Sequence, residues 1–261
     1  MMGRIGGTPI ATVKVWMKEE YFVVFLYSKY TYLEGYFRHV FLCDRRDTMN
    51  TKKITTIGIL CAMAVVINVL IHFPMVPAVS FLSYDPKDII IVIGGFIYGP
   101  MISLLMSGIT SVLELMYRGG TILDVVMNMV STCAFACTAA FIYKKMHNKK
   151  GALIGLVAGV ISMTVMMVIW NYIVTPIYYG MPREAVVAMM LPGIIPFNLL
   201  KSGLNAGITL LLYKPIVGAL RYTNLVEKKD NNGKSNTGFI ILGLFIIATA
   251  FFLVLALKGI I

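Results

Sequence analysis

Polar side chains recur on one face of the apolar run near residue 200. Asn198 and Lys201 are three residues apart and Asn205 follows four residues later, so all three share a face if the run is helical. Amide and ammonium groups in hydrocarbon are costly, and they mark a binding or transport site when they face the interior. The competing interpretation, a lysine that extends to the membrane surface, does not account for the amides beside it. The pattern therefore favours a ligand site that includes Asn198 and Lys201.

A further amide and a loop motif are candidates for the same site. Asn171 lies between a tryptophan and a tyrosine, which are common anchors at membrane interfaces. The anchors do not explain Asn171, whose amide can both donate to and accept from the edge of a heteroaromatic ring. Tyr84 and Asp85 lie in a loop and could cover a ligand that enters from outside. A simple turn, followed by Asp88 as the expected helix cap, would explain the same loop.

Two other apolar runs carry polar groups of their own. Glu114 would be an uncompensated charge in lipid, so it must have a polar neighbour, and Arg118 lies one helical turn away. We therefore expect these two to pair near the membrane interface. Asp124 and Asn128 are four residues apart, and Asn128 is expected about two turns below the outer end of its helix. This depth makes Asn128 a further candidate for the binding site.

Motifs for catalysis, metal binding and nucleotide binding are absent from the sequence. It contains no nucleophile elbow, P-loop, HExxH or paired catalytic carboxylates. The three histidines are scattered, and the four cysteines form no cluster with the spacing of a metal site. We therefore expect no enzyme activity, no metal and no cofactor. Any active transport needs energy from another subunit or from an ion gradient.

The elements that hold these residues must lie mostly in lipid. Of the 261 residues, 58% are hydrophobic and 13% are charged, and the mean hydropathy is +0.81. A soluble domain has roughly 45–50% apolar and about 25% charged residues, and one of this size could not bury so much apolar surface. The net charge of +11 comes from lysines and arginines that collect between apolar runs, as in cytoplasmic loops. Nucleic-acid binding is therefore not expected.

Seven apolar runs separate the polar segments. A bilayer-spanning helix needs about 20 apolar residues, and the second run is so short that we expect it to be tilted or broken at Gly94-Gly95. Alternation across the membrane places the lysine-rich loops inside and leaves Lys87, Arg118 and Arg183 in loops on the other side. The sequence thus predicts an all-α membrane protein of six or seven membrane helices, over residues 54–73, 88–98, 101–117, 122–143, 151–174, 191–213 and 238–257.

The chain divides into four parts by composition. Residues 1–48 are interrupted by charges and lack the layout of a signal peptide. Met49 stands directly before the first membrane helix like a natural start, so residues 1–48 come either from a start site placed too far upstream or from a flexible or interfacial extension. Residues 49–221 form the predicted membrane domain, 222–237 a polar cytoplasmic linker, and 238–261 an additional membrane helix.

Three motifs, in chain order, resemble the riboflavin-specific S components of energy-coupling factor (ECF) transporters. They match the family's first loop with its second helix, its Asn-Tyr near the end of helix five, and its Pro-Phe-Asn-x-x-Lys signature in helix six; in this chain they are residues 84–100, Asn171-Tyr172 and residues 193–203. The resemblance implies a six-helix bundle that binds riboflavin near the extracellular side. It implies hydrogen bonds to the vitamin from Asn171, Asn198 and Lys201, with contributions from Asn128, Tyr84 and Asp85.

The same resemblance implies partners and a location. An ECF S component lies in the plasma membrane of a bacterium, with a transmembrane coupling subunit and two ATPase subunits. It contacts the coupling subunit through small residues of its first helix. Here that role falls on Gly58, Ala62 and Ala64, whose spacing lets another helix approach closely. The last apolar run is additional to the six-helix core, and the resemblance implies no role for it.

Other functions fit the residues less well. An S component for thiamine would need acidic and stacked aromatic residues, and one for folate would need cationic residues, whereas two amides and a lysine suit the edge of a flavin. An intramembrane enzyme would need paired carboxylates, a Ser/Lys or Ser/His couple, or histidine ligands within the spans. A purely structural subunit would not need Asn171, Asn198 and Lys201 in lipid. Riboflavin binding is therefore the expected function.

Overall fold

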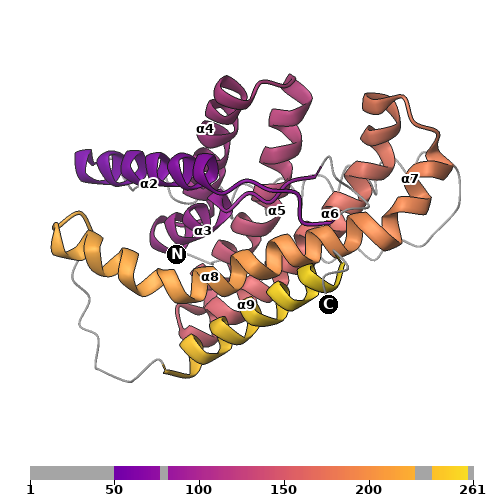
Figure 1. Ribbon diagram of the computed structural model, residues 1–261. Helices are drawn as coiled ribbons and strands as arrows, with labels where there is room; N and C mark the ends of the chain where they lie inside the picture. The colour runs from indigo at the N-terminus through magenta and orange to yellow at the C-terminus, as the bar shows by residue number, and fades with distance from the viewer. Residues whose placement is uncertain (1–49, 77–81, 227–236, 258–261) are drawn as a thin grey trace, which may run out of the picture. The chain divides into compact units, whose positions relative to one another are not determined.

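The computed structural model describes residues 50–76, 82–226 and 237–257, and these residues are almost entirely helical (Figure 1). Apart from one antiparallel bridge between Pro74 and Ser83, the described residues contain no β-structure. The predicted all-α class is therefore confirmed. The elements are α2 (Thr51–Leu70), α3 (Lys87–Tyr98), α4 (Pro100–Arg118), α5 (Ile122–Met146), α6 (Lys149–Tyr179), α7 (Arg183–Met189), the π-helical turn η2 (Met190–Ile194), α8 (Ile195–Tyr222) and α9 (Thr237–Leu257).

Five helical segments are long and apolar enough to cross a bilayer. They are α2, α4, α5, α6 and the continuous segment Arg183–Tyr222, which joins α7, η2 and α8. Within α9, Ile240–Phe251 is a shorter apolar stretch. The prediction of a multi-pass membrane protein is confirmed by these helices.

The second predicted span, α3, is a short helix inside the bundle. Its 12 residues rise only about 18 Å, less than the hydrocarbon thickness of about 30 Å. Every residue from Lys87 to Phe96 is buried, and α3 contacts α2, α4, α5 and α8. The break predicted at Gly94-Gly95 is wrong, because the helix continues through both glycines. A Cβ on Gly95 would overlap Ser103 Oγ and lie 2.9 Å from Cβ of Ala140, so the missing side chain lets α4 and α5 approach.

The helical segment before α9 is longer than predicted at both ends. The prediction ran from residue 191 to 213, whereas the segment runs from Arg183 to Tyr222. Pro196 lies in the first turn of α8, directly after the π-helical turn. Pro192 lies in the π-helical turn, a wider local geometry that interrupts the regular pattern without ending the helix. Pro215 lies inside α8, as membrane helices tolerate.

Helices α5 and α6 pack closely against each other through glycines of α6. A Cβ on Gly155 would lie 2.7 Å from the carbonyl oxygen of Ala139, and a Cβ on Gly159 would lie 2.7 Å from that of Phe135. Both glycines are buried. Small residues at such positions let membrane helices approach until side chains and backbones are in van der Waals contact. These two helices carry Asn128 and Asn171, so their packing positions two of the candidate site residues.

Gly159→Ala is therefore expected to destabilise the protein by about 1–2 kcal/mol, because overpacking exceeds the small gain in helix propensity. The matched control is Gly203→Ala in α8, where a Cβ would meet nothing within 4 Å. That variant should be as stable as the wild type or more stable. Unfolding of the purified protein by a denaturing detergent measures both. A Gly159→Ala variant as stable as the Gly203→Ala variant would contradict the packing described here.

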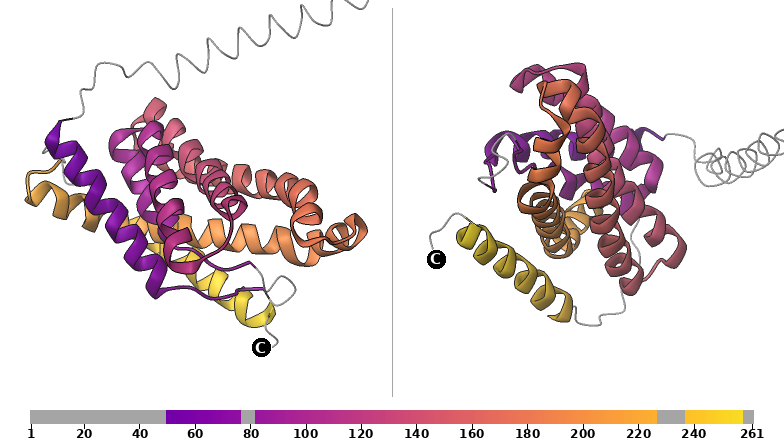
Figure 2. Two further views of the ribbon diagram at one scale, coloured as in Figure 1. Left: turned by 90° about the horizontal axis from the view of Figure 1, so that it is seen from above. Right: turned by 90° about the vertical axis from the view of Figure 1, so that its right-hand side faces the viewer.

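The additional helix α9 packs against α8, which it crosses at an angle (Figure 1 and Figure 2). A Cβ on Gly207 would lie 3.3 Å from the carbonyl oxygen of Gly243, and a Cβ on Gly243 would lie 3.0 Å from that of Gly207. Ala250 belongs to a buried cluster that also contains Leu82 and Tyr84 of the loop before α3. Residues 1–48 and most of the predicted linker 222–237 lie outside the described residues.

Candidate functional site

A cavity of about 210 Å³ lies among α4, α5, α6, α8 and the loop between α2 and α3. Its lining combines apolar side chains, including Met167 and Phe197, with amides and ionisable groups. Four of the six predicted binding residues line it: Asp85, Asn128, Asn198 and Lys201. A smaller adjoining hollow is lined by Asn171 and shares Leu82, Asp124 and Met127 with the main cavity.

Lys201 points into the interior of the bundle. Its Nζ donates to Oδ2 of Asp85 at 3.0 Å, and both side chains are 7% exposed. The predicted interior position is therefore confirmed, and the alternative of a lysine that extends to the surface is wrong. The carboxylate of Asp85 supplies the counter-ion that an ammonium at this depth requires. The role of Lys201 in ligand binding stays a prediction.

The amides of Asn198 and Asn171 are oriented by their own helices. Asn198 Nδ2 donates to the carbonyl oxygen of Ile194 at 2.8 Å, and Asn171 Nδ2 donates to that of Met167 at 2.7 Å. Asn171 Oδ1 also accepts from Thr175 Oγ1 at 2.9 Å. An amide offers two N–H donors and one oxygen acceptor, so one bond to the helix fixes its direction and still leaves it capable of binding a ligand.

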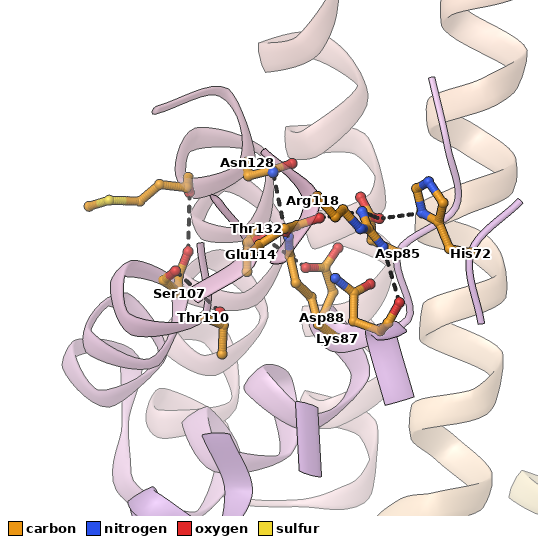
Figure 3. A network of polar contacts seen from close by, with 12 residues as sticks. His72, Asp85, Lys87, Asp88, Ser107, Thr110, Glu114, Arg118, Asn128 and Thr132 are labelled. Carbon is orange, nitrogen blue, oxygen red and sulfur yellow. Dashed lines mark hydrogen bonds and ion pairs between the residues drawn. The ribbon is translucent and has the colours of Figure 1, made fainter. Parts of the chain in front are cut away.

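Glu114 is the shared acceptor of three side chains (Figure 3). It pairs with Lys87 and with Arg118, and Asn128 Nδ2 donates to it at 3.2 Å. The predicted Glu114–Arg118 pair is confirmed. The prediction that placed Lys87 in an outer loop is wrong, because Lys87 is the first residue of α3 and is 1% exposed. A buried lysine is tolerated here because Glu114 compensates its charge.

Asp85 connects the loop to cations from two helices and to a histidine of the same loop. Its Oδ1 accepts from Arg118 Nη1 at 2.9 Å and lies 3.5 Å from His72 Nδ1 (Figure 3). Its Oδ2 accepts from Lys201. Burial raises the pKa of Asp85, but the positive charges of Lys201 and Lys87 lower that pKa well below its usual range. Asp85 is therefore ionised at neutral pH.

A second buried network holds the same loop in place. Tyr84 Oη donates to Asn205 Oδ1 at 2.7 Å, and Asn205 Nδ2 donates to Asp88 Oδ2 at 3.3 Å. Thr132 Oγ1 donates to the other oxygen of Asp88 at 2.7 Å. Burial, with Asp88 and Asp85 nearby, raises the pKa of Tyr84, so its hydroxyl keeps the proton that it donates.

The prediction that Asp88 caps the helix needs correction. Asp88 is not the helix cap, because Pro86 occupies the N-cap position and Asp88 lies in the first turn with its carboxylate directed to α5 and α8. Tyr84 is buried and is not among the residues that line the cavity, because its hydroxyl bonds to Asn205 of α8 and so anchors the loop. Its role in ligand binding stays a prediction.

The small residues of α2 do not all lie on its outer face. Gly58 and Ala62 are exposed, as contact with a partner requires. Ala64 is fully buried in the hydrophobic core. Two residues beyond Ala62, the helix has turned by about 200°, so Ala64 faces the opposite side. Its inclusion in a partner-facing surface is therefore wrong.

Ser111 lines the cavity, although the sequence analysis did not single it out. It is 1% exposed, and its hydroxyl is one of the few buried polar atoms in the described part of the chain without a hydrogen-bond partner. A bound ligand could satisfy such a hydroxyl. The four-residue spacing of Ser103, Ser107 and Ser111, with Glu114 following, is a polar face on α4 that could have indicated it.

A family model matches the part of the chain that forms the cavity. Residues 52–213 match the model described as the substrate-specific component of ECF transporters. The matched stretch includes every side chain that lines the cavity and ends before α9.

Similar proteins include riboflavin transporters of two bacteria. The riboflavin transporter FmnP of Bacillus subtilis is 29% identical over 163 residues, which are 59% of this chain and 85% of that protein. The riboflavin transporter RibU of Staphylococcus aureus is 28% identical over 181 residues, which are 67% of this chain and 95% of that protein. A solved structure, described as the S component of a bacterial ECF transporter, has a TM-score of 0.57 and 29% identity and covers 65% of this chain and 98% of its own.

Proposed function

The chain belongs to the family of ECF transporter substrate-specific components, and on this premise we propose that it binds riboflavin from outside the cell and delivers it across the membrane. Two similar proteins of 28–29% identity are named riboflavin transporters. The observation that carries the proposal is the cavity in which Asn198 and Lys201 meet apolar side chains within the bundle.

Riboflavin suits the chemistry of this cavity. Its isoalloxazine ring is flat, and one edge carries hydrogen-bond donors and acceptors. Phe197 and Met167 offer apolar contact to the ring, while Asn198 and Lys201 offer polar groups to its edge. Asn171 lines the adjoining hollow from the opposite helix, within reach of a ligand that fills both spaces. The vitamin is uncharged, so it needs no additional counter-ion in the bundle.

The cavity must enlarge to hold a ligand of this size. Its volume of about 210 Å³ is below the roughly 300–1,000 Å³ of typical ligand sites. We propose that the ligand edge takes the place of Asp85 as acceptor for the Lys201 ammonium, and that Asp85 stays with Arg118. Such an exchange keeps each buried charge compensated, because a carbonyl oxygen of the ring replaces a carboxylate oxygen.

We also propose that transport requires a coupling subunit and two ATPase subunits, and that the chain catalyses no reaction of its own. The sequence carries no nucleotide-binding motif, so the energy must come from elsewhere. Gly58 and Ala62 remain our candidates for the contact with the coupling subunit, because both are exposed on α2 and are four residues apart.

The direct test is the absorbance spectrum of the full-length protein purified in detergent. We expect a flavin spectrum in the purified protein, or quenching of riboflavin fluorescence when the vitamin is added to it. An Asn198→Leu variant serves as the comparison, since it removes the polar group and retains similar volume. A colourless wild-type protein that leaves riboflavin fluorescence unchanged at micromolar protein would show that the proposal is wrong.

A further inference from the structure

The charges that line the cavity are paired unequally. Glu114 is shared by Lys87 and Arg118, so one carboxylate serves two cations. The ammonium of Lys201 instead has the carboxylate of Asp85 at 3.0 Å, and Arg118 contacts the other oxygen of that carboxylate. Three cations thus share two carboxylates, and removing Asp85 would leave Lys201 without the carboxylate that contacts it.

Other carboxylates near the cavity are engaged elsewhere. Asp124 Oδ2 accepts from the backbone N–H of Thr121 at 2.7 Å and from the hydroxyl of Tyr178 at 2.9 Å, at the start of α5. Asp88 is bonded to side chains of α5 and α8 and does not line the cavity. Asp85 is thus the carboxylate that neutralises the inner ammonium.

Asp85 lies between the inner end of the cavity and its opening. The side chains that it contacts become more exposed outward: Lys201 is 7% exposed, Arg118 23% and His72 39%. The backbone of Asp85 is also held, because its carbonyl oxygen accepts from Asn205 Nδ2 at 3.4 Å. A ligand that enters past His72 and Arg118 therefore meets a carboxylate that is fixed in place.

We propose that Asp85 makes the cavity select the uncharged vitamin over its phosphate ester, an inference that rests on the proposed riboflavin binding. A phosphate monoester carries a charge of about −1.5 to −2 near neutral pH. Next to Asp85 it is repelled, and when it pairs with Lys201 or Arg118 it takes one of the cations that Asp85 contacts and places its own negative charge beside that carboxylate. Riboflavin can take the place of Asp85 at Lys201 without adding a negative charge. Asp85 is in this sense a specificity-determining residue.

The test compares the dissociation constants of riboflavin and riboflavin 5′-phosphate for the full-length protein, measured by fluorescence quenching at neutral pH. The wild type should bind riboflavin more tightly. Asp85→Asn keeps the size of the side chain and removes its charge. The ratio of the dissociation constant of the phosphate to that of riboflavin should therefore fall by about 10- to 100-fold. Asp85→Glu keeps the charge and should keep the preference. Glu184→Gln, which removes an exposed charge in α7, should leave the ratio unchanged.

Several outcomes would decide against the inference. An unchanged ratio in Asp85→Asn overturns it, as does equal change in Glu184→Gln. If Asp85→Asn binds neither flavin, the Arg118→Gln variant is measured instead. Loss of this cation beside Asp85 should raise the ratio of the dissociation constant of the phosphate to that of riboflavin. A ratio that does not rise overturns the inference. A wild-type protein that binds riboflavin and its phosphate equally overturns this inference alone. A wild-type protein that binds neither overturns the proposed function on which it rests.

Discussion

Glu114→Gln is expected to lower the free energy of unfolding by about 3–5 kcal/mol, the usual consequence of leaving a buried charge without its partner. Glu114 accepts from Lys87 and Arg118. Arg118 keeps two other partners in the variant, since it also donates to Asp85 at 2.9 Å and to the carbonyl oxygen of Asn68 at 3.0 Å. Lys87 is 1% exposed at the start of α3, and the neutral amide cannot compensate its charge. The loss therefore falls mainly on Lys87.

The measurement is the fraction of folded protein against the concentration of a denaturing detergent. The double variant Lys87→Met, Glu114→Gln should recover most of the lost stability, because a buried pair can be replaced by neutral groups of similar volume at little cost. The exposed Glu184 provides the control, and Glu184→Gln should stay within about 0.5 kcal/mol of the wild type. If Glu114→Gln were as stable as that control, Lys87 would have to find compensation that the structure does not show.

The ends of α3 show where local sequence determines structure. Gly99 has a φ of 94°, a conformation that favours glycine, and Pro100 opens α4 where its missing N–H is not needed. The predicted end at residue 98 is therefore the observed end. The predicted sixth span included Pro192 and Pro196 but began at residue 191, whereas the helical segment begins at Arg183. Arg183 was assigned to a loop because of its charge, and a π-helical turn and a first-turn position accommodate the two prolines within the helix.

The site was predictable only in part, and for a physical reason. Asn198 and Lys201 were recognisable because both stand out in an apolar run, and their spacing alone places them on one helix face. Their partners were not recognisable, since Asp85 is 116 residues from Lys201 along the chain. Lys87 resembled an ordinary loop charge because its counter-ion is 27 residues away on another helix. Only tertiary packing brings such charges together.

Lys201→Met is expected to weaken riboflavin binding by about 2–5 kcal/mol, the cost of removing one partner from a desolvated charged hydrogen bond. At the lower limit the dissociation constant rises roughly 30-fold. Lys201 is nearly fully buried and lines the cavity, so water cannot replace the lost donor easily. Titration of riboflavin fluorescence measures the change. Lys214→Met is the matched control, because Lys214 is exposed on the same helix, α8, and should bind riboflavin like the wild type.

Adding Lys201→Met to the Asp85→Asn variant shows whether Lys201 contacts the ligand directly or acts on ligand binding only through Asp85. If Lys201 binds the ligand itself, Lys201→Met should weaken riboflavin binding further when Asp85→Asn is already present. If Lys201 serves only to hold the carboxylate 3.0 Å away, the double variant should bind no worse than Asp85→Asn alone, since the group to be held has lost its charge. The second result would remove Lys201 from the ligand contacts and leave the vitamin to the amides of Asn171 and Asn198. The first would establish that an ammonium buried in the bundle is retained for its ligand, at a depth where a lysine with only a structural role would be needlessly costly.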